Sequence, residues 1–140
     1  MSNWDHSVDL LVVGSGAGAM SAGIRGSDLG LDVLLLEKGE TYGGSSAMSG
    51  GVCWVGNNLH MEKSGLEDSD EDTLTYLSHI TQGEVAESLL INYRDNSKRM
   101  VEYFAKQTHL HFMPLTEYTD YYPEAPGGKL GGRSMEPLPF

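Results

Sequence analysis

The sequence predicts an α/β fold in which a parallel sheet is built from strand–helix–strand units. Two short apolar runs, residues 8–13 and 31–36, have the composition of strands that are buried on both faces. Between them, residues 17–29 are small or helix-tolerant, and they stop at Gly30, a residue suited to follow the end of a helix. Residues 8–37 therefore form a predicted βαβ unit, which closes right-handed onto a parallel sheet.

A glycine motif of the form G-x-G-x-x-[G/A] joins the first predicted strand to the helix. Gly14 would make the tight turn and Gly16 would let the backbone approach a pyrophosphate, while Ala19 and Gly23 would keep the helix close to the sheet. The helix N-terminus then offers unpaired N–H groups and a positive dipole end to phosphates. The fold is therefore predicted to be Rossmann-like. The candidate phosphate-binding residues are Gly14, Ser15, Gly16, Ala17, Gly18 and Ala19.

An acidic residue ends the second predicted strand. Glu37 lies 18 residues after Ala19, where a carboxylate would accept hydrogen bonds from the ribose hydroxyls of an adenine dinucleotide. The same charge repels a 2′-phosphate, which disfavours NADP. The alternative is a plain βαβ turn that happens to be followed by an acid.

A second glycine-rich segment, residues 43–51, follows closely. Two glycine pairs flank hydroxyl-bearing residues, and such a loop can wrap a long, phosphate-containing ligand with N–H and O–H donors. This physical argument favours FAD and leaves NAD and a flexible linker open. The predicted cofactor-binding residues of the segment are Gly43, Gly44, Ser45, Ser46, Ser49, Gly50 and Gly51.

The second half of the chain is predicted to be helical over residues 70–107. The spacing predicts one helix over 70–81 and an amphipathic one over 85–107, whose apolar stripe is Val85, Leu89, Tyr93, Met100 and Phe104, widened by Leu90 and Val101. A strand is predicted over 111–115, ending at Pro114, and the tail from Pro123 is predicted to be irregular.

No metal site is predicted. The acidic segment 62–72 lacks the glycine and spacing of a calcium loop, and we interpret it as a solvated loop leading into a helix N-terminus. His109 and His111 would share one strand face, but no third ligand is nearby in sequence.

The composition excludes several classes of protein. The 140 residues include 20 acidic and 9 basic side chains, a formal net charge of −11, which argues against binding to nucleic acid or an anionic membrane face. No apolar run is long enough for a membrane span, and the N-terminus lacks a signal peptide. The single cysteine, Cys53, excludes an internal disulfide. We expect a soluble, cytoplasmic protein.

Several segments together resemble a known family. Residues 9–18, Leu36-Glu37-Lys38 and residues 43–51 are similar to the N-terminus of the fumarate reductase/succinate dehydrogenase-type FAD flavoproteins, most of all to the FAD-dependent 3-ketosteroid dehydrogenases (3-oxosteroid 1-dehydrogenases). Asp120-Tyr121-Tyr122-Pro123 and residues 132–137 resemble a segment typical of that subgroup. The resemblance adds Lys38 to the predicted cofactor-binding residues.

The resemblance implies an oxidoreductase with non-covalent FAD and a small-molecule substrate, a 3-ketosteroid. A tyrosine base would take a proton from C2, the flavin N5 would take hydride from C1, and another tyrosine would polarise the C3 carbonyl. Only Tyr121 of this chain corresponds to an active-site tyrosine, where it would line the substrate pocket and support the base. We expect Tyr118 and Tyr122 only to pack. A phenol is a poor base near neutral pH unless a neighbour stabilises its anion.

The resemblance also implies that relatives are several times longer. Residues 1–140 are therefore predicted to be the N-terminal part of an incomplete FAD-binding domain, with a substrate-side loop over 116–140. We expect the 140 residues alone neither to hold FAD tightly nor to turn over steroid. Two alternatives remain: a fumarate-reductase-like flavoprotein acting on another substrate, and an inactive nucleotide-binding fragment. The electron acceptor is not predicted.

Overall fold

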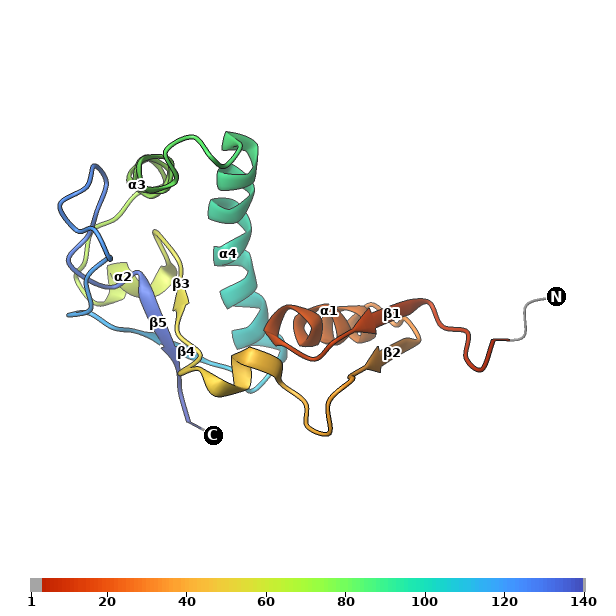
Figure 1. Cartoon of the computed structure of the whole chain (residues 1–140). Coiled ribbons are helices and arrows are strands. Elements are labelled where there is room, and N and C mark those ends of the chain that lie inside the picture. Colours follow the sequence, from red (N-terminus) through yellow and green to blue (C-terminus); the bar gives the residue numbers. More distant parts are fainter. Residues whose placement is uncertain (1–3, 140) are drawn as a thin grey trace. The chain divides into compact units, whose positions relative to one another are not determined.

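The computed structural model describes residues 4–139 and divides the chain into two compact units (Figure 1). The N-terminal unit is Met1–Gly51 and the C-terminal unit is Val52–Phe140. No helix within residues 4–139 combines the length and the apolar character that a bilayer crossing requires.

The N-terminal unit is the predicted βαβ unit. Strand β1 (Leu10–Val13) and strand β2 (Val33–Leu36) pair in parallel, and helix α1 (Ala17–Asp28) connects them. After α1, Gly30 has a φ of +79°, its N–H donates to Ser27 O and the Leu31 N–H donates to Gly26 O. These two bonds form a Schellman motif, which confirms Gly30 as the residue that ends the helix.

Helix α1 makes a close contact with the strands at Gly26, a position that the sequence analysis missed. A Cβ on Gly26 would lie 2.6 Å from Leu10 Cδ2 and 3.1 Å from Val33 Cγ2, whereas one on Gly23 would lie 4.0 Å from its nearest neighbours. Gly26 therefore lies closer to the strand side chains than Gly23 does. The motif predicts the close contact at Ala19 and at Gly23 one turn later, but of the two glycines the tighter one is Gly26, three residues further on.

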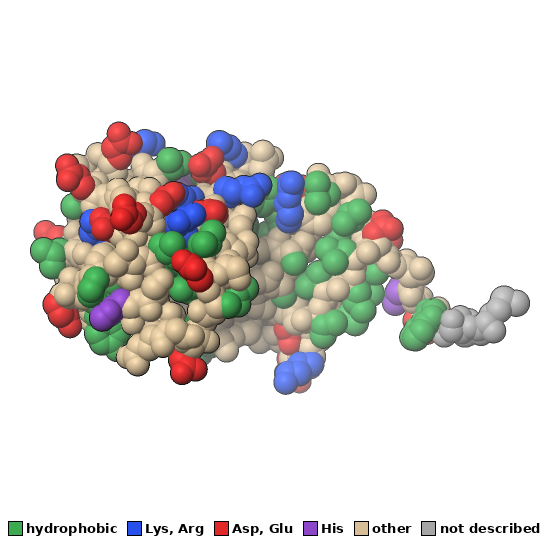
Figure 2. Space-filling view, turned by 90° about the horizontal axis from the view of Figure 1, so that it is seen from above, with side chains coloured by type: hydrophobic (Ala, Val, Ile, Leu, Met, Phe, Trp, Pro, Cys, Tyr) green, Lys and Arg blue, Asp and Glu red, His purple; other side chains and the backbone are tan. Residues whose placement is uncertain are grey.

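The expectation that both strands are buried on both faces is wrong for the described residues. Leu10 and Val12 face α1, and Val12 is buried. Leu11 and Val13 point to the other face and are 53% and 78% exposed. The reason is that α1 covers only one face of this two-stranded sheet. Hydrophobic side chains are also visible on the surface of this unit (Figure 2).

The C-terminal unit combines three helices with a small antiparallel sheet. Its helices are α2 (Leu59–Lys63), α3 (Asp70–Thr81) and α4 (Glu87–Gln107). Its strands are β3 (Cys53–Trp54), β4 (Phe112–Pro114) and β5 (Ser134–Pro137), in the order β3-β5-β4. The predicted bounds of α3 are confirmed, those of α4 begin two residues early, and β4 ends at Pro114 as predicted. The prediction of an irregular tail is wrong at β5, which is the central strand.

The core of this unit is built around β5. Met135 is fully buried in a cluster with Val55, Val101 and Phe112. The predicted stripe of α4 is partly wrong, because the buried positions are Leu90, Ser97, Val101 and Phe104, while Leu89 is 60% exposed and Tyr93 is also exposed. The true face includes Ser97, whose hydroxyl donates to Arg94 O. The prediction placed the stripe wrongly because it followed apolar residues alone, whereas the buried face of α4 contains the polar Ser97.

The acidic segment is also less solvated than expected. Ser69 caps α3 by accepting a hydrogen bond from the Asp72 N–H at 2.9 Å, as a helix N-terminus requires. The Asp68 side chain, however, is 0% exposed and pairs with Arg133. The interpretation as a solvated loop is therefore wrong at Asp68, because a cation 65 residues later in the sequence compensates its burial.

Candidate cofactor and substrate sites

The turn after β1 has the geometry that the glycine motif predicts. Gly14 has a φ of +97°, and its N–H donates to Leu36 O at 2.7 Å. Gly16 is the N-cap of α1 and is extended, with no side-chain capping bond of its own. Helix geometry leaves the first N–H groups of α1 without intrahelical acceptors, and no acidic residue stands in the first turn. This end of α1 can therefore accept an anionic group.

Ser15 holds three segments together. Its side chain is buried, its hydroxyl donates to the Glu37 carboxylate (Oε2), and it accepts a hydrogen bond from the Gly43 N–H at 2.9 Å. The other Glu37 oxygen accepts from the Gly39 N–H at 2.9 Å. The Ser15 bond, followed by that from Gly39, lowers the pKa of Glu37. The hydroxyl of Ser15 is thus engaged within the protein, and Glu37 is held ionised beside the end of β2.

Residues 43–51 fold onto the glycine turn. The segment was expected to be a loop, and it instead contains a 3₁₀ helix over Gly44–Met48. Ser46 Oγ accepts from the Ala17 N–H at 3.1 Å, and a Cβ on Gly44 would lie 3.7 Å from the Gly16 backbone. The structure therefore brings the two predicted glycine-rich segments together.

The remaining predicted residues of this unit are placed as follows. Ser49 Oγ donates to Ser46 O and accepts from the Gly51 N–H, so its hydroxyl closes the local turn. Ser45, Gly50 and Lys38 are exposed. The residues around Gly14 and Gly16 thus present main-chain donors and no bulky side chain, which fits the phosphates of a dinucleotide, and Glu37 fits its ribose.

A cavity of about 340 Å³ lies within the C-terminal unit. Apolar and aromatic side chains, a few hydroxyls and one carboxylate form its walls, and its lining residues include no lysine, arginine or histidine. Its lining residues are Val52, Trp54, Tyr76, Leu77, Ile80, Tyr118, Thr119, Asp120, Tyr121 and Ser134. A cavity of this size and polarity is suited to a small, flat, neutral molecule.

The tyrosines predicted near the substrate behave differently. Tyr121 lines the cavity from its rim and is 85% exposed. Tyr118, which was expected only to pack, lines the same cavity and is also exposed, while Tyr122 does not line it. Tyr121 and Tyr118 therefore both present side chains at the cavity.

An aromatic stack forms the inner wall of the cavity. The rings of Trp54 and Tyr76 stack with centroids 5.7 Å apart, and Tyr93 stacks on the indole at 6.4 Å. The Tyr93 hydroxyl donates to Trp54 O at 2.5 Å. Burial raises the pKa of both Tyr76 and Tyr93. Tyr76 is therefore a wall of the cavity and is unsuited to act as a base, while Tyr93, which is not among the lining residues, backs the indole of Trp54. The sequence analysis missed this wall.

The part of the chain that the structure describes holds no group of three histidine, cysteine or acidic residues arranged to bind a metal ion. Cys53 packs against the core cluster, and burial raises the pKa of its thiol.

Known proteins resemble this chain over nearly all of its length. The family described as FAD binding domain matches residues 9–137. A 3-oxosteroid 1-dehydrogenase of Mycobacterium tuberculosis is 44% identical over 94% of this chain and 23% of its own length. A 4-oxocyclohexanecarboxylate 2-dehydrogenase of Sinomonas cyclohexanicum is 35% identical over 92% of this chain and 22% of its own length.

Among solved structures, a 3-ketosteroid Δ1-dehydrogenase from Sterolibacterium denitrificans in complex with 1,4-androstadiene-3,17-dione matches with a TM-score of 0.89. It is 50% identical, and the match covers 94% of this chain and 23% of that one. The chain thus spans about a quarter of the length of the relatives it matches. These findings confirm the predicted resemblance, the Rossmann-like α/β fold and FAD as the cofactor.

Proposed function

The chain belongs to the FAD binding domain family, and we propose that it contributes a dinucleotide cradle and part of a substrate pocket to an enzyme that desaturates ring A of a 3-ketosteroid. The observation that carries the substrate assignment is the cavity of the C-terminal unit. Its walls are mainly aromatic and aliphatic, its polar groups are hydroxyls and the Asp120 carboxylate, and its lining residues include no lysine, arginine or histidine. Such walls suit a flat, neutral ketone better than an acid.

The cradle residues would hold FAD non-covalently. The main-chain N–H groups around Gly16 and the start of α1 would bind the pyrophosphate, with Ser46 and the 43–51 segment closing over it. The Glu37 carboxylate would accept hydrogen bonds from the ribose. When bound, FAD supplies the acceptor for the hydride that leaves C1.

Tyr121 is the residue of this chain that we assign to the reaction. Its position at the cavity rim lets its hydroxyl meet a ketone bound in the cavity or the tyrosine that takes the C2 proton, a residue we place outside this chain. Tyr118 lines the same cavity and would help to orient the ring. Loss of a proton from C2 and of a hydride from C1 would together form the C1–C2 double bond.

The test uses the natural-length protein with its flavin. Mixing it with a 3-ketosteroid in the absence of oxygen should bleach the oxidised flavin band as the substrate is desaturated. A matched saturated 3-hydroxysteroid should leave the band unchanged, because it has no carbonyl to acidify C2. A flavin that fumarate-like acids reoxidise but that ketosteroids never bleach would overturn the substrate assignment and favour the fumarate-reductase-like alternative.

A further inference from the structure

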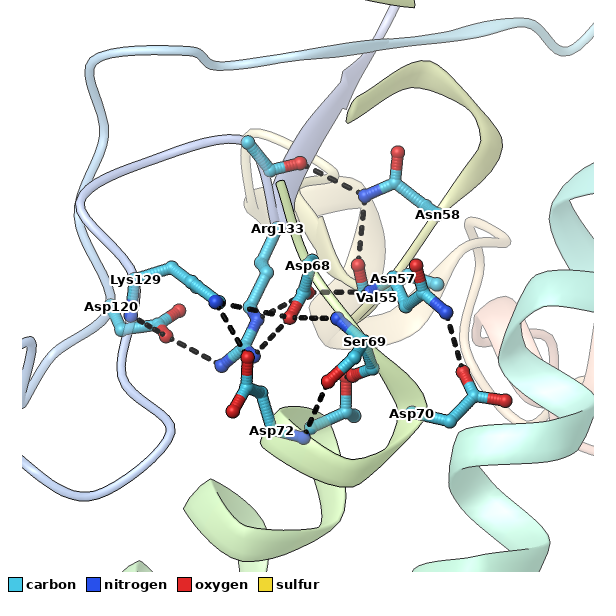
Figure 3. Close-up of polar contacts among 12 residues, drawn as sticks. Val55, Asn57, Asn58, Asp68, Ser69, Asp70, Asp72, Asp120, Lys129 and Arg133 are labelled. Carbon is cyan, nitrogen blue, oxygen red and sulfur yellow. Dashed lines mark hydrogen bonds and ion pairs between the residues drawn. The ribbon is translucent and has the colours of Figure 1, made fainter. Parts of the chain in front are cut away.

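A buried arginine lies directly behind the aromatic wall of the cavity. Arg133 is 1% exposed, and its Nε and Nη2 atoms donate to the two Asp68 oxygens at 2.7 Å each (Figure 3). Its Nη1 donates to Asp120 Oδ2 at 2.9 Å. The fork-shaped bond to Asp68 and the bond to Asp120 fix the guanidinium plane. We call Arg133, Asp68 and Asp120 the buried ion cluster.

The cluster contacts both rings of the wall. The Arg133 guanidinium carbon lies 5.3 Å from the Trp54 ring centroid and 5.5 Å from that of Tyr76. Asp120 Oδ1 also accepts the Trp54 Nε1–H at 2.6 Å. Pairing of Trp54 with Ser134 between β3 and β5 places the indole next to Arg133 along the sheet. The rings are therefore held by a cation on their faces and by a carboxylate at the indole edge.

Carboxylates of the protein itself neutralise the charge of Arg133. Two carboxylates, Asp68 and Asp120, face one guanidinium. The nearest further cation, Lys129, bonds to Asp72 at 2.7 Å and lies 3.9 Å from Asp68. These two cations and three carboxylates sum to −1, and Asp120 is itself part of the cavity lining. Both Asp120 oxygens are already bonded, to the Trp54 indole, to Arg133 and to the Lys129 N–H. An anionic ligand in the cavity would therefore lie beside a carboxylate and would find no lysine, arginine or histidine among the lining residues to pair with.

We propose that the buried ion cluster makes the cavity selective for flat, neutral ring ketones and against carboxylated ones. Arg133 is a positioning residue that fixes the Trp54–Tyr76 wall, and Asp120 supplies the charge that disfavours an acid. This inference rests on the proposed function, because it takes the cavity to be the substrate pocket. Acidic ring ketones are a relevant alternative, because a relative of this chain, the 4-oxocyclohexanecarboxylate 2-dehydrogenase, is named for one.

The positioning role is tested in the natural-length holoenzyme with Arg133→Lys. Lysine keeps the positive charge but lacks the planar guanidinium, which makes two hydrogen bonds to Asp68 and lies over the rings of Trp54 and Tyr76. We expect the KM for a neutral 3-ketosteroid to rise about tenfold and kcat to stay within about threefold. The matched control is Lys98→Met, which breaks another ion pair of this unit, to Asp70 at 2.5 Å, away from the cavity lining. An unchanged KM, or a fall in kcat alone, would overturn the role.

The charge argument is tested with a matched pair of competitors, 4-oxocyclohexanecarboxylate and its methyl ester. With ketosteroid oxidation as the assay, the inhibition constant of the ester should be at least about tenfold lower than that of the acid. Asp120→Asn should reduce this ratio of inhibition constants. Equal or tighter inhibition by the acid overturns the selectivity. Asp120→Asn also serves if Arg133→Lys does not fold, because it leaves the Arg133–Asp68 fork intact and should raise the ketosteroid KM by a smaller factor.

A measurement that needs no turnover separates this inference from the proposed function. In protein labelled with 5-fluorotryptophan, the Trp54 resonance is assigned from Trp54→Phe. Arg133→Lys should shift this resonance, Lys98→Met should not, and added ketosteroid should shift it in the wild type. Flavin bleaching without a ketosteroid-induced shift would overturn the inference and leave the proposed function standing. Absence of both would reject the proposed function.

Discussion

Main-chain groups present the candidate cofactor site of the N-terminal unit, whereas buried charged side chains hold the cavity wall of the C-terminal unit. Around Gly14 and Gly16 the ligand-facing donors are N–H groups, and the one buried side chain that organises them is the hydroxyl of Ser15. In the C-terminal unit, the ion pair of Arg133 and Asp68 holds the aromatic wall of the cavity in place. A site of main-chain donors is sensitive to an added Cβ, and a site backed by buried ions is sensitive to a lost charge.

The largest expected effect concerns flavin retention by the 140-residue chain. In the N-terminal unit one face of the sheet is uncovered, and the cradle supplies contacts for the phosphates and ribose. We expect this chain to co-elute with far less than one FAD per protein on gel filtration, while the natural-length protein retains it. Stoichiometric flavin on the 140-residue chain would contradict this and would mean that the main-chain cradle suffices.

The next largest effect is on the stability of the natural-length protein. Arg133→Met removes the guanidinium fork from the buried Asp68 and leaves Lys129, at 3.9 Å, as its remaining cation, which should lower the free energy of unfolding by about 3–5 kcal/mol. The control is Lys106→Met, which removes an exposed i,i+4 pair with Glu102 and should cost less than about 0.5 kcal/mol. Denaturant titration followed by tryptophan emission measures both. Similar small losses would show that Asp68 is solvated after all.

Two glycines of α1 test how sensitive the N-terminal unit is to an added Cβ. Gly26→Ala would place a methyl group against Leu10 and Val33 and should destabilise the protein by about 1–2 kcal/mol. Gly23→Ala has room for its methyl group and should stabilise it by about 0.5–1 kcal/mol, because alanine is the better helix former. The difference in melting temperature between the two variants gives the sign. Equal effects would mean that α1 does not lie as close to β1 as the structure has it.

The two units also differ in how much of their structure could be predicted from the sequence. The βαβ unit and Gly30 follow from local patterns, since glycine spacing and apolar runs encode backbone geometry directly. The sequence assigned residues 14–19 and 43–51 to one ligand, but the direct contact between them, from the Ala17 N–H to Ser46, was not predicted. The cavity wall does not, because Arg133, Asp68 and Trp54 come together only through pairing of β3 with β5 and packing of α3. Strand β5 was missed for the same reason: Ser-Met-Glu-Pro has no strand pattern, and its partners are remote in sequence.

The smallest expected effect is a pH dependence centred on Ser15. Its hydrogen bond is the largest cause that lowers the pKa of Glu37, so the folded pKa lies below the unfolded one. The ionised carboxylate then contributes stability above the ordinary Glu range, and that contribution disappears as the pH falls through the lowered folded pKa. Ser15→Ala should bring the Glu37 pKa back toward its ordinary value and weaken this acid dependence. Carboxyl ¹³C NMR titration, with the signal assigned from Glu37→Gln, measures it.

The control for this prediction is Ser49→Ala, which removes a hydroxyl of the same unit that bonds only within the 43–51 segment. It should leave the Glu37 titration unchanged, because Ser49 has no bond to the carboxylate. A Glu37 pKa that is the same in the wild type and in Ser15→Ala would contradict the Ser15–Glu37 bond. It would also remove the link between the buried Ser15 hydroxyl and Glu37, and so sharpen the contrast between the main-chain donors of this unit and the buried ions of the C-terminal unit.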